Sequence, residues 1–262
     1  MVRSFFIVCV AFSILLPQLK LKAQKYPEIV FVKGGAFQMG NKNGEPDERP
    51  VHTVILSDFY IGKYEITVEQ YKAFCKEVGK QLPQEPPASW YEEHPNAAKW
   101  IWKSNYPIVN VTWKDAMGYC EWLSKKTGHQ YTLPTEAQWE YAARGGQKSK
   151  NYKYSGSNSI NKVAWYDETT YEKGPKSVGT LKPNELDIYD MSGNAWEWCL
   201  DNFAKYPAGT LKNPKGPTST PFKVIRGGSW YYVENLARLT ARDGPYPHYT
   251  NYNYGFRVVR IP

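Results

Sequence analysis

The feature that most constrains this chain is its supply of amphipathic rings and of residues that bend the backbone. It contains 21 Tyr and 10 Trp together with 20 Gly and 19 Pro. Gly and Pro interrupt regular helices and strands, while Tyr and Trp bury a large apolar face and keep a polar tip. We therefore expect a loop-rich fold fixed by aromatic side chains. A helical bundle, a coiled coil, a collagen helix and a multi-span membrane protein are excluded.

The rest of the composition is that of an ordinary folded chain. Hydrophobic residues make up 42% of the 262 residues and charged residues 22%, which is too apolar for general disorder. The length suffices to bury a full hydrophobic core. No internal repeat or low-complexity linker divides the sequence, so we expect residues 24–262 to form a single domain.

Residues 1–23 have the pattern of a secretory signal peptide. Arg3 provides the positive start, residues 5–16 form an apolar run, and Ala23 is a small residue suited to the position before cleavage. The run is shorter than the ~20 residues of a membrane-spanning helix, which argues against an uncleaved anchor. The position of Cys9 inside the run argues against a lipoprotein. We predict a secreted or periplasmic protein with no membrane span after signal cleavage.

The net charge and the cysteines indicate which binding partners and metal ions are expected. Loss of the signal peptide removes three basic residues and no acidic one, so the formal net charge falls from +8 to +5. The lysines are scattered, which does not favour nucleic acid as a partner.

Cys75, Cys120 and Cys199 remain after cleavage, and an oxidising compartment would allow one disulfide among them. Because Cys75 and Cys120 fall on apolar faces of helical segments, we expect buried structural thiols there. No zinc-ligand spacing occurs.

Three segments carry the start and stop signals of helices. Each begins at a threonine followed three residues later by Gln or Asp, the capping-box pattern or one close to it, and each ends at a glycine. The predicted helices begin after Thr67, Thr112 and Thr135 and end at Gly79, Gly128 and Gly145. Strands are expected near residues 28–32, 54–61 and 255–261. Few periodic segments follow residue 146, which predicts irregular structure held by aromatic rings and arginine pairs, with a metal ion as a further candidate.

The segment from Asp190 to Glu197 has features of a metal site. It places two carboxylates seven residues apart around a Gly-Asn turn. Calcium takes six to eight hard oxygen ligands, and a turn can add main-chain carbonyl oxygens to a pair of acids. Asp190, Glu197 and the carbonyls of Gly193 and Ala195 would form such a set. From spacing alone, a capped turn with one exposed acid is the favoured alternative.

Several stretches, taken together and in their order, form a recognisable set. They are Gly34-Gly35-x-Phe37-x-Met39-Gly40, Asp47-Glu48-Arg49-Pro50-x-His52, Glu65-x-Thr67, Pro107-x-x-x-Val111-x-Trp113-x-Asp115-Ala116, Leu133-Pro134-Thr135-Glu136-Ala137-x-Trp139-Glu140-Tyr141-Ala142, Gly193-Asn194-Ala195-Trp196-Glu197-Trp198, Arg226-Gly227-Gly228-Ser229-Trp230 and Gly255-Phe256-Arg257. The set resembles the sulfatase-modifying-factor family, whose founding member is the formylglycine-generating enzyme. The resemblance covers about residues 28–260.

The resemblance implies an α+β fold, the formylglycine-generating-enzyme fold, which is C-type-lectin-like and has little regular secondary structure. It also implies calcium bound by one Asn or Asp side chain, two backbone carbonyls and a Glu. Those ligands correspond to Asp190, Gly193, Ala195 and Glu197, so structural calcium is the expected cofactor. A second calcium site of the family matches poorly near residues 161–167 and is not assigned.

The catalytic residues of the family are not found at the corresponding positions of this chain. The founding enzyme oxidises a substrate cysteine with copper(I) held by two thiolates, and soft sulfur ligands suit that ion. The two cysteines lie two and seven residues after the aromatic residue that follows Gly-Gly-Ser. Counted from Trp230, these positions are Tyr232 and Ala237, and no cysteine follows Cys199. Copper is therefore not expected, and no catalytic residue is assigned.

A ligand groove is the remaining expectation. The family's groove positions correspond to Trp196, Ser229 and Asn253, and residues 230–254 add Trp230 and six tyrosines, whose flat faces and hydroxyls suit sugars or a peptide segment. Packing within a loop-rich domain is the alternative for any single tyrosine. The predicted groove comprises Trp196, Ser229, Trp230, Tyr231, Tyr232 and Asn253.

Two arginines and one histidine near the groove are not assigned to ligand binding or catalysis. Arg238 and Arg242 match arginine positions of the family, and we expect them to pair with buried acids. His248 is the only histidine of residues 230–254, and no three-His or two-His-one-carboxylate iron site is assignable around it.

Three functions follow. The first is an exported calcium-binding accessory module whose groove binds an exported protein segment or a glycan. The second, which rests on family analogy, is an oxidoreductase of the non-haem iron type. The third is formylglycine formation, which the missing thiolates disfavour.

Overall fold

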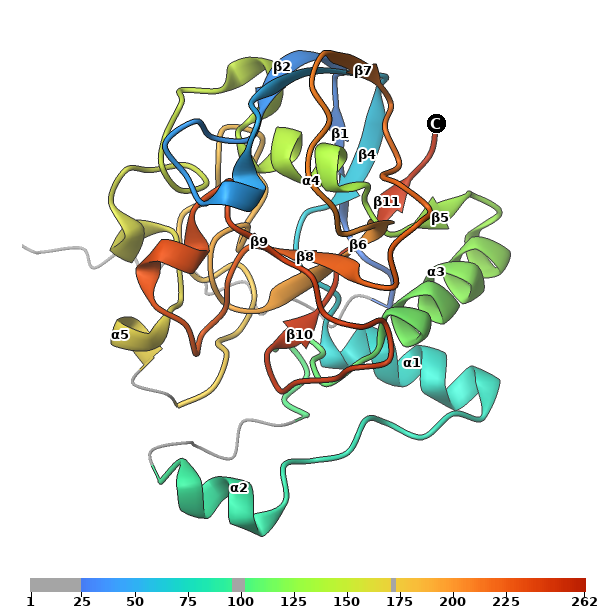
Figure 1. Ribbon diagram of the computed structural model, residues 1–262. Coiled ribbons are helices and arrows are strands. Elements are labelled where there is room, and N and C mark those ends of the chain that lie inside the picture. Colours follow the sequence, from blue (N-terminus) through green and yellow to red (C-terminus); the bar gives the residue numbers. More distant parts are fainter. Residues whose placement is uncertain (1–24, 96–101, 171–172) are drawn as a thin grey trace, which may run out of the picture.

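The computed structural model of the protein describes residues 25–95, 102–170 and 173–262 (Figure 1). The predicted signal peptide at residues 1–23 lies outside these residues. Short strands and helices alternate with long loops, as an α+β fold requires. Within the described part of the chain, no helix has the length and apolar character needed to cross a bilayer.

Three small sheets form the framework of the described residues. The first has the order β1-β4-β11-β5, the second β10-β6-β8-β9 and the third β2-β3-β7. Pairing is antiparallel except for β10 with β6 and β3 with β7. The strands are β1 (Ile29–Val32), β2 (Gly35–Met39), β3 (His52–Leu56), β4 (Phe59–Gly62), β5 (Tyr131–Thr132), β6 (Trp196–Asn202), β7 (Thr210–Lys212), β8 (Lys223–Arg226), β9 (Arg242–Asp243), β10 (Tyr254–Gly255) and β11 (Val259–Arg260).

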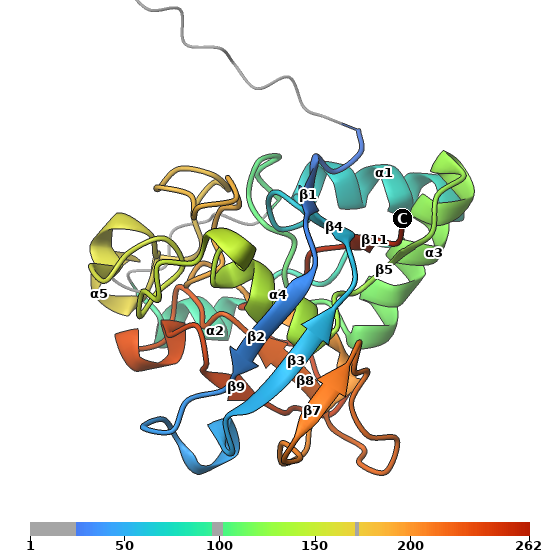
Figure 2. The same cartoon turned by 90° about the horizontal axis from the view of Figure 1, so that it is seen from above.

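Five α-helices and four 3-10 helices, counted over the same described ranges, accompany these sheets. Helices α1 and α3 pack together on one side, α4 lies in the centre, and α2 lies at the lower end of the molecule in Figure 1 (see also Figure 2). The α-helices are α1 (Val68–Val78), α2 (Ala88–Glu93), α3 (Trp113–Thr127), α4 (Glu136–Ala143) and α5 (Asp167–Thr170). The 3-10 helices are η1 (Pro46–Glu48), η2 (Gly146–Lys148), η3 (Ile160–Lys162) and η4 (Glu234–Ala237).

The three helices expected from the capping signals are confirmed. Thr67, Thr112 and Thr135 each accept a hydrogen bond from the backbone N–H three residues on, and the side chain at that position bonds back to the threonine. Gly79 and Gly128 end α1 and α3 in the left-handed conformation, which glycine adopts without a steric penalty. These boundaries are set locally, so the sequence could specify them.

Two strand predictions were wrong in the same way. The segment 54–61 is two strands of different sheets, because the chain leaves one sheet at Ser57 and Asp58. The Ser57 N–H donates to the side chain of Asn213, and Asp58 accepts from the Gly34 N–H. The segment 255–261 likewise divides into β10 and β11, which belong to different sheets. Period-two patterns do not show where a strand changes partners.

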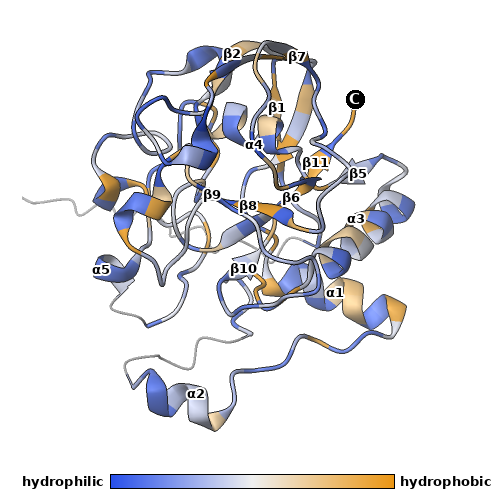
Figure 3. Ribbon diagram, in the orientation of Figure 1, coloured by the Kyte–Doolittle hydropathy of each residue, from blue (hydrophilic) through white to orange (hydrophobic). Residues whose placement is uncertain are grey.

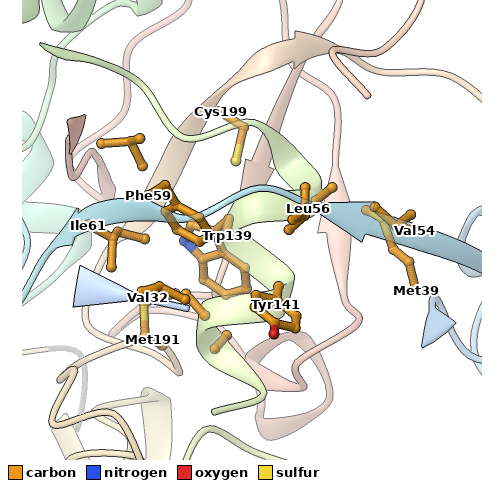
Figure 4. Packing of buried hydrophobic residues seen from close by; sticks show 14 of the residues in the cluster. Val32, Met39, Val54, Leu56, Phe59, Ile61, Trp139, Tyr141, Met191 and Cys199 are labelled. Atoms are coloured by element: carbon orange, nitrogen blue, oxygen red, sulfur yellow. The ribbon is translucent and has the colours of Figure 1, made fainter. Parts of the chain in front are cut away.

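Aromatic residues fill the centre, as the composition predicted. Trp139 on α4 is fully buried and lies between Phe59 and Tyr141 in one of the two main hydrophobic clusters (Figure 4). A second cluster joins α1, α3 and β8 through stacked rings such as Tyr71 and Tyr119. Strand β8 has two hydrophobic residues at its centre, Val224 and Ile225, whereas the short helix α5 is hydrophilic (Figure 3).

Buried ion pairs fix the loops to this core. Glu136 at the start of α4 bonds both Arg226 and Arg242, at 2.9 and 2.6 Å. Arg238 pairs with Glu48 at 2.7 Å. The expected pairing of Arg238 and Arg242 with buried acids is confirmed. Breaking such a pair leaves a charge in a low-dielectric interior, which typically costs about 3–5 kcal/mol.

The paired rings of α1 and α3 generate a stability prediction. The hydroxyls of Tyr71 and Tyr119 are buried and have no hydrogen-bond partner in the described structure. An unpartnered buried hydroxyl costs about 1–3 kcal/mol, so Tyr119→Phe should leave the free energy of unfolding in urea unchanged or raise it. Tyr206→Phe is the matched control, because the Tyr206 hydroxyl donates to buried Glu136 at 2.9 Å. That control should lose about 1–3 kcal/mol, and equal losses in both variants would contradict the interpretation.

Candidate functional site

The turn before β6 is held in an unusual backbone conformation. Asp190, Gly193 and Asn194 all have positive φ angles, of 57°, 76° and 64°. A Cβ atom at Gly193 would lie 2.2 Å from the carbonyl oxygen of Trp165, so only glycine fits there. The N–H groups of Gly193 and Asn194 donate to Gly227 and Trp165, both at 2.7 Å. The turn is therefore rigid and enclosed.

Three buried carboxylates gather around this turn. Glu65, after β4, accepts from the Asn194 side chain at 2.6 Å and from the Ala195 N–H at 2.9 Å. Asp190 accepts from the Gly179 N–H at 2.7 Å. Glu197 forms a bidentate pair with Arg257 at 2.6 and 2.7 Å. The three carboxylates lie close enough for the charges of Asp190 and Glu197 to raise the pKa of Glu65, so they share one buried region.

Negative charge exceeds positive charge in this region. Burial raises the pKa of Glu65 well above its usual value, and the nearby Asp190 and Glu197 raise it further. Burial also raises the pKa of Asp190 to about 6. Arg257 is the guanidinium that opposes these three acids. Buried carboxylates in excess of their partners either take up protons or bind a cation.

The donor set fits a hard cation such as calcium. In the described structure, only one oxygen of Asp190 has a hydrogen-bond donor, and no hydrogen bond ends on the carbonyl oxygens of Gly193 or Ala195. Glu197 is already bonded by Arg257 and by the Trp139 indole N–H, at 2.8 Å. Among the residues of known placement, no group of three or more His, Cys, Asp and Glu side chains is arranged to hold a metal. Of the four predicted ligands, Asp190 and the carbonyls of Gly193 and Ala195 thus have acceptor oxygens to offer, whereas the carboxylate of Glu197 is engaged by Arg257 and Trp139.

Glu65 is a residue of this region that sequence reasoning left without a role. It stands in the stretch Glu65-x-Thr67, immediately before the capping box of α1. Its contacts with Asn194 and Ala195 span about 130 positions along the chain. The signal in the sequence was its place in the motif Glu65-x-Thr67.

A separate cavity of about 200 Å³ lies where the ligand groove was expected. Of the predicted groove residues, Trp230, Tyr231, Tyr232 and Asn253 line it. Trp196 and Ser229 do not line it and are buried beneath it. Trp196 packs edge-on to Tyr232 with ring centroids 6.1 Å apart, and the Ser229 carbonyl accepts from the Tyr232 N–H.

Helix α2 supplies a wall of this cavity that the sequence did not predict. Trp90 stacks on His94 at 4.2 Å and meets Trp230 and Tyr252 edge-on at 6.4 and 5.5 Å. His94 in turn lies 5.6 Å from Tyr231. The cavity is completed by Asn251 and Tyr252. Helix α2 has six residues and no side-chain cap, so the sequence lacks a local signal from which this helix could be predicted.

Asn253 gives the aromatic cavity a polar point of contact. This residue is 2% exposed, and its Oδ1 atom is buried with no hydrogen-bond partner in the described structure. Its side chain is hydrogen-bonded to Tyr232, and burial raises the pKa of the Tyr232 phenol. An unpartnered amide oxygen costs free energy until a donor reaches it. The cavity is thus suited to a ligand that presents an apolar or ring-shaped group and one N–H or O–H donor.

The turn and the cavity are directly connected. The Asn194 carbonyl accepts from the Trp230 N–H at 2.9 Å, and Ala195 packs against Trp230. The next residue, Trp196, donates its N–H to the Asn253 carbonyl at 2.8 Å. The geometry of the turn therefore fixes the floor of the cavity.

The thiols lie elsewhere. Cys75, Cys120 and Cys199 are free thiols, not joined in a disulfide, and are buried in the hydrophobic clusters. Burial raises the pKa of all three, to about 11 for Cys75. The expected buried thiols at Cys75 and Cys120 are confirmed. Ala237, at the end of η4, is packed in a cluster with Tyr154 and Tyr166.

The chain belongs to the sulfatase-modifying factor enzyme 1-like domain family, whose pattern matches residues 17–262. It is 31% identical to the serine/threonine-protein kinase pkn1 of Chlamydia pneumoniae over 89% of this chain, but spans only 38% of that protein's length. It is 36% identical to the chaperone protein LppX of Paenibacillus barcinonensis, over 89% of each chain. It is 31% identical to the formylglycine-generating enzyme of Streptomyces coelicolor, over 88% of each chain.

Solved structures agree with the fold. Treponema denticola variable protein 1 superposes with a TM-score of 0.77 at 25% identity, over 89% of this chain and 95% of that one. PvdO from Pseudomonas aeruginosa superposes with a TM-score of 0.74 at 28% identity, over 91% and 96%. The fold and family expected from the sequence motifs are confirmed.

The carboxylate surplus predicts a pH dependence of stability without calcium. Because the pKa of Asp190 is raised to about 6 in the folded state, its contribution is fully present below about pH 4 and is lost as the pH rises through 6. A pKa that is one unit higher in the folded than in the unfolded chain corresponds to ~1.4 kcal/mol of stability. In urea unfolding with a chelator, the wild type should therefore lose stability relative to Asp190→Asn between pH 5 and pH 7.5. Added calcium should restore the wild type at neutral pH, and parallel pH profiles of the two proteins without calcium would contradict the prediction.

Proposed function

We propose that the protein is an exported, calcium-binding accessory module that captures a protein segment or a glycan in the aromatic cavity. The observation that carries the proposal is the cavity itself: five Trp and Tyr rings and one histidine line it together with Asn253, whose Oδ1 atom has no hydrogen-bond partner among the described residues. Aromatic faces bind sugar rings and peptide side chains, while the Asn253 oxygen accepts one hydrogen bond from the ligand. A volume of about 200 Å³ suits one ring or one large side chain.

Calcium has a structural role in this proposal. Bound at Asp190 and the carbonyls of Gly193 and Ala195, it would neutralise the surplus carboxylate charge and hold the strained turn. Because the Asn194 carbonyl and Ala195 support Trp230, the ion would also pre-organise the floor of the cavity. Pre-organisation of this kind raises affinity by lowering the ordering cost of binding.

The alternative is an oxidoreductase of the same family. It is favoured by 31% identity with a formylglycine-generating enzyme over 88% of each chain. That enzyme class, however, depends on thiolates, and no cysteine follows Cys199 while no thiol of the described residues lines the aromatic cavity. For iron, a three-ligand set would be needed, and His94 in the cavity wall is accompanied there by aromatic and amide side chains. The kinase activity named for the chlamydial relatives belongs to longer proteins and is not proposed here.

The proposal predicts that Tyr231→Ala weakens capture on peptide and glycan arrays. Tyr231 is 36% exposed at the cavity, so its removal takes away contact area without opening the core, and a roughly tenfold loss is expected. Tyr249→Ala is the matched control, because Tyr249 is 51% exposed and does not line this cavity. The array that retains a signal distinguishes peptide from glycan.

Two further outcomes decide this test. A calcium chelator should reduce capture by the wild type, because it releases the turn beneath Trp230. Capture that is unchanged in Tyr231→Ala, or reduced equally in Tyr249→Ala, would contradict binding at the aromatic cavity.

A further inference from the structure

A second, larger cavity lies apart from the aromatic one. Its volume is about 430 Å³, within the range of small-molecule sites, and none of its lining residues is shared with the aromatic cavity. It lies between the edge strand β7 and the C-terminal end of β6, whereas helix α2 is at the opposite end of the molecule (Figure 1). Its walls are mainly apolar and include Met39, Tyr206, Leu211, Pro214 and Pro217.

The floor of this cavity contains a buried carboxylate. Asp201, near the end of β6, is 4% exposed and lines the cavity. One of its oxygens accepts from the Glu136 N–H at 2.9 Å. No ion pair to Asp201 is formed within the described part of the chain, whereas the neighbouring Glu136 is paired with both Arg226 and Arg242. Of these two adjacent buried acids, only Glu136 thus has guanidinium partners among the described residues.

The positive groups around Asp201 are engaged or distant. Lys223 lowers the pKa of Asp201 from a distance, but its ammonium donates to the Leu200 carbonyl at 2.9 Å and lies 4.1 Å from the Trp113 ring. Lys205 and Lys215 are exposed at the rim. Burial first, and Glu136 second, raise the pKa of Asp201 to about 7. The carboxylate is therefore short of a cation.

The cavity wall beside Asp201 is fixed in place. Gly216 has a φ of 71°, and a Cβ atom there would lie 2.9 Å from the Cβ of Asp201. A larger residue would be strained in this conformation and would crowd the carboxylate. The two prolines on either side, Pro214 and Pro217, restrict the same loop. A pre-formed wall of this kind favours binding of a ligand over collapse of the loop onto Asp201.

We infer that this cavity binds a small amine, a molecule with an apolar body and one ammonium group that pairs with Asp201. The apolar walls match the body of such a ligand, and the carboxylate at the floor matches its charge. A neutral ligand of the same shape would leave the Asp201 charge uncompensated and bind more weakly. The site is independent of the calcium turn and of the aromatic cavity.

Calorimetric titration with phenethylammonium chloride tests the inference, with 2-phenylethanol as the neutral probe of similar shape. The ammonium probe should bind the wild type, and Asp201→Asn should weaken it on the order of tenfold or more, because a charge-assisted hydrogen bond is lost. Asp187→Asn is the charge-matched control, since Asp187 is an exposed residue that does not line the cavity. This control should bind as the wild type does.

A second variant keeps the test decisive if Asp201→Asn fails to fold. Ala204 lines the cavity, and only its backbone carbonyl is used by Arg242, so Ala204→Leu fills space without removing a partner. It should abolish binding of the ammonium probe. Equal affinity for the ammonium and alcohol probes, or binding unaffected by both Asp201→Asn and Ala204→Leu, would overturn the inference.

Discussion

The fold depends on carboxylates and guanidinium groups that are buried together. Long loops cannot bury enough apolar surface to hold themselves in place, and their polar backbone needs partners. Arg226, Arg242 and Arg238 meet this need by joining β8, β9 and the segment between these strands to Glu136 and Glu48. These pairs are largely desolvated, so they specify one arrangement of the loops, although each pair itself adds little net stability.

The candidate sites lie where this pairing of buried acids with guanidinium groups is incomplete. Around the turn at Asp190, three buried acids oppose Arg257, and the surplus charge fits a hard cation. That turn supports Trp230 through the carbonyl of Asn194, so the proposed metal site and the aromatic cavity are structurally linked. Asp201, further along strand β6, is another buried acid without an ion pair among the described residues. Unbalanced charge in the interior, more than cavity size, identifies both candidate sites.

Local signals predicted much of this structure and long-range contacts explain the rest. The start of α1 could be predicted because Thr67 and its partner are three residues apart. The break between β3 and β4 could not, because it depends on a bond from Ser57 to Asn213, 156 positions away. The cavity wall formed by Trp90 and the role of Glu65 could not be predicted for the same reason, because their partners are distant in the chain. Family motifs placed the groove residues, and tertiary packing decided which of them line the cavity.

Metal analysis of the purified protein, combined with measurement of oxygen consumption in the presence of a cysteine-containing peptide, tests the central claim most directly. The account predicts calcium in a stoichiometric amount, copper and iron at background, and no oxygen uptake. Stoichiometric copper or iron together with oxygen uptake would contradict it, because the chain would then perform redox chemistry for which the proposed module has no ligands.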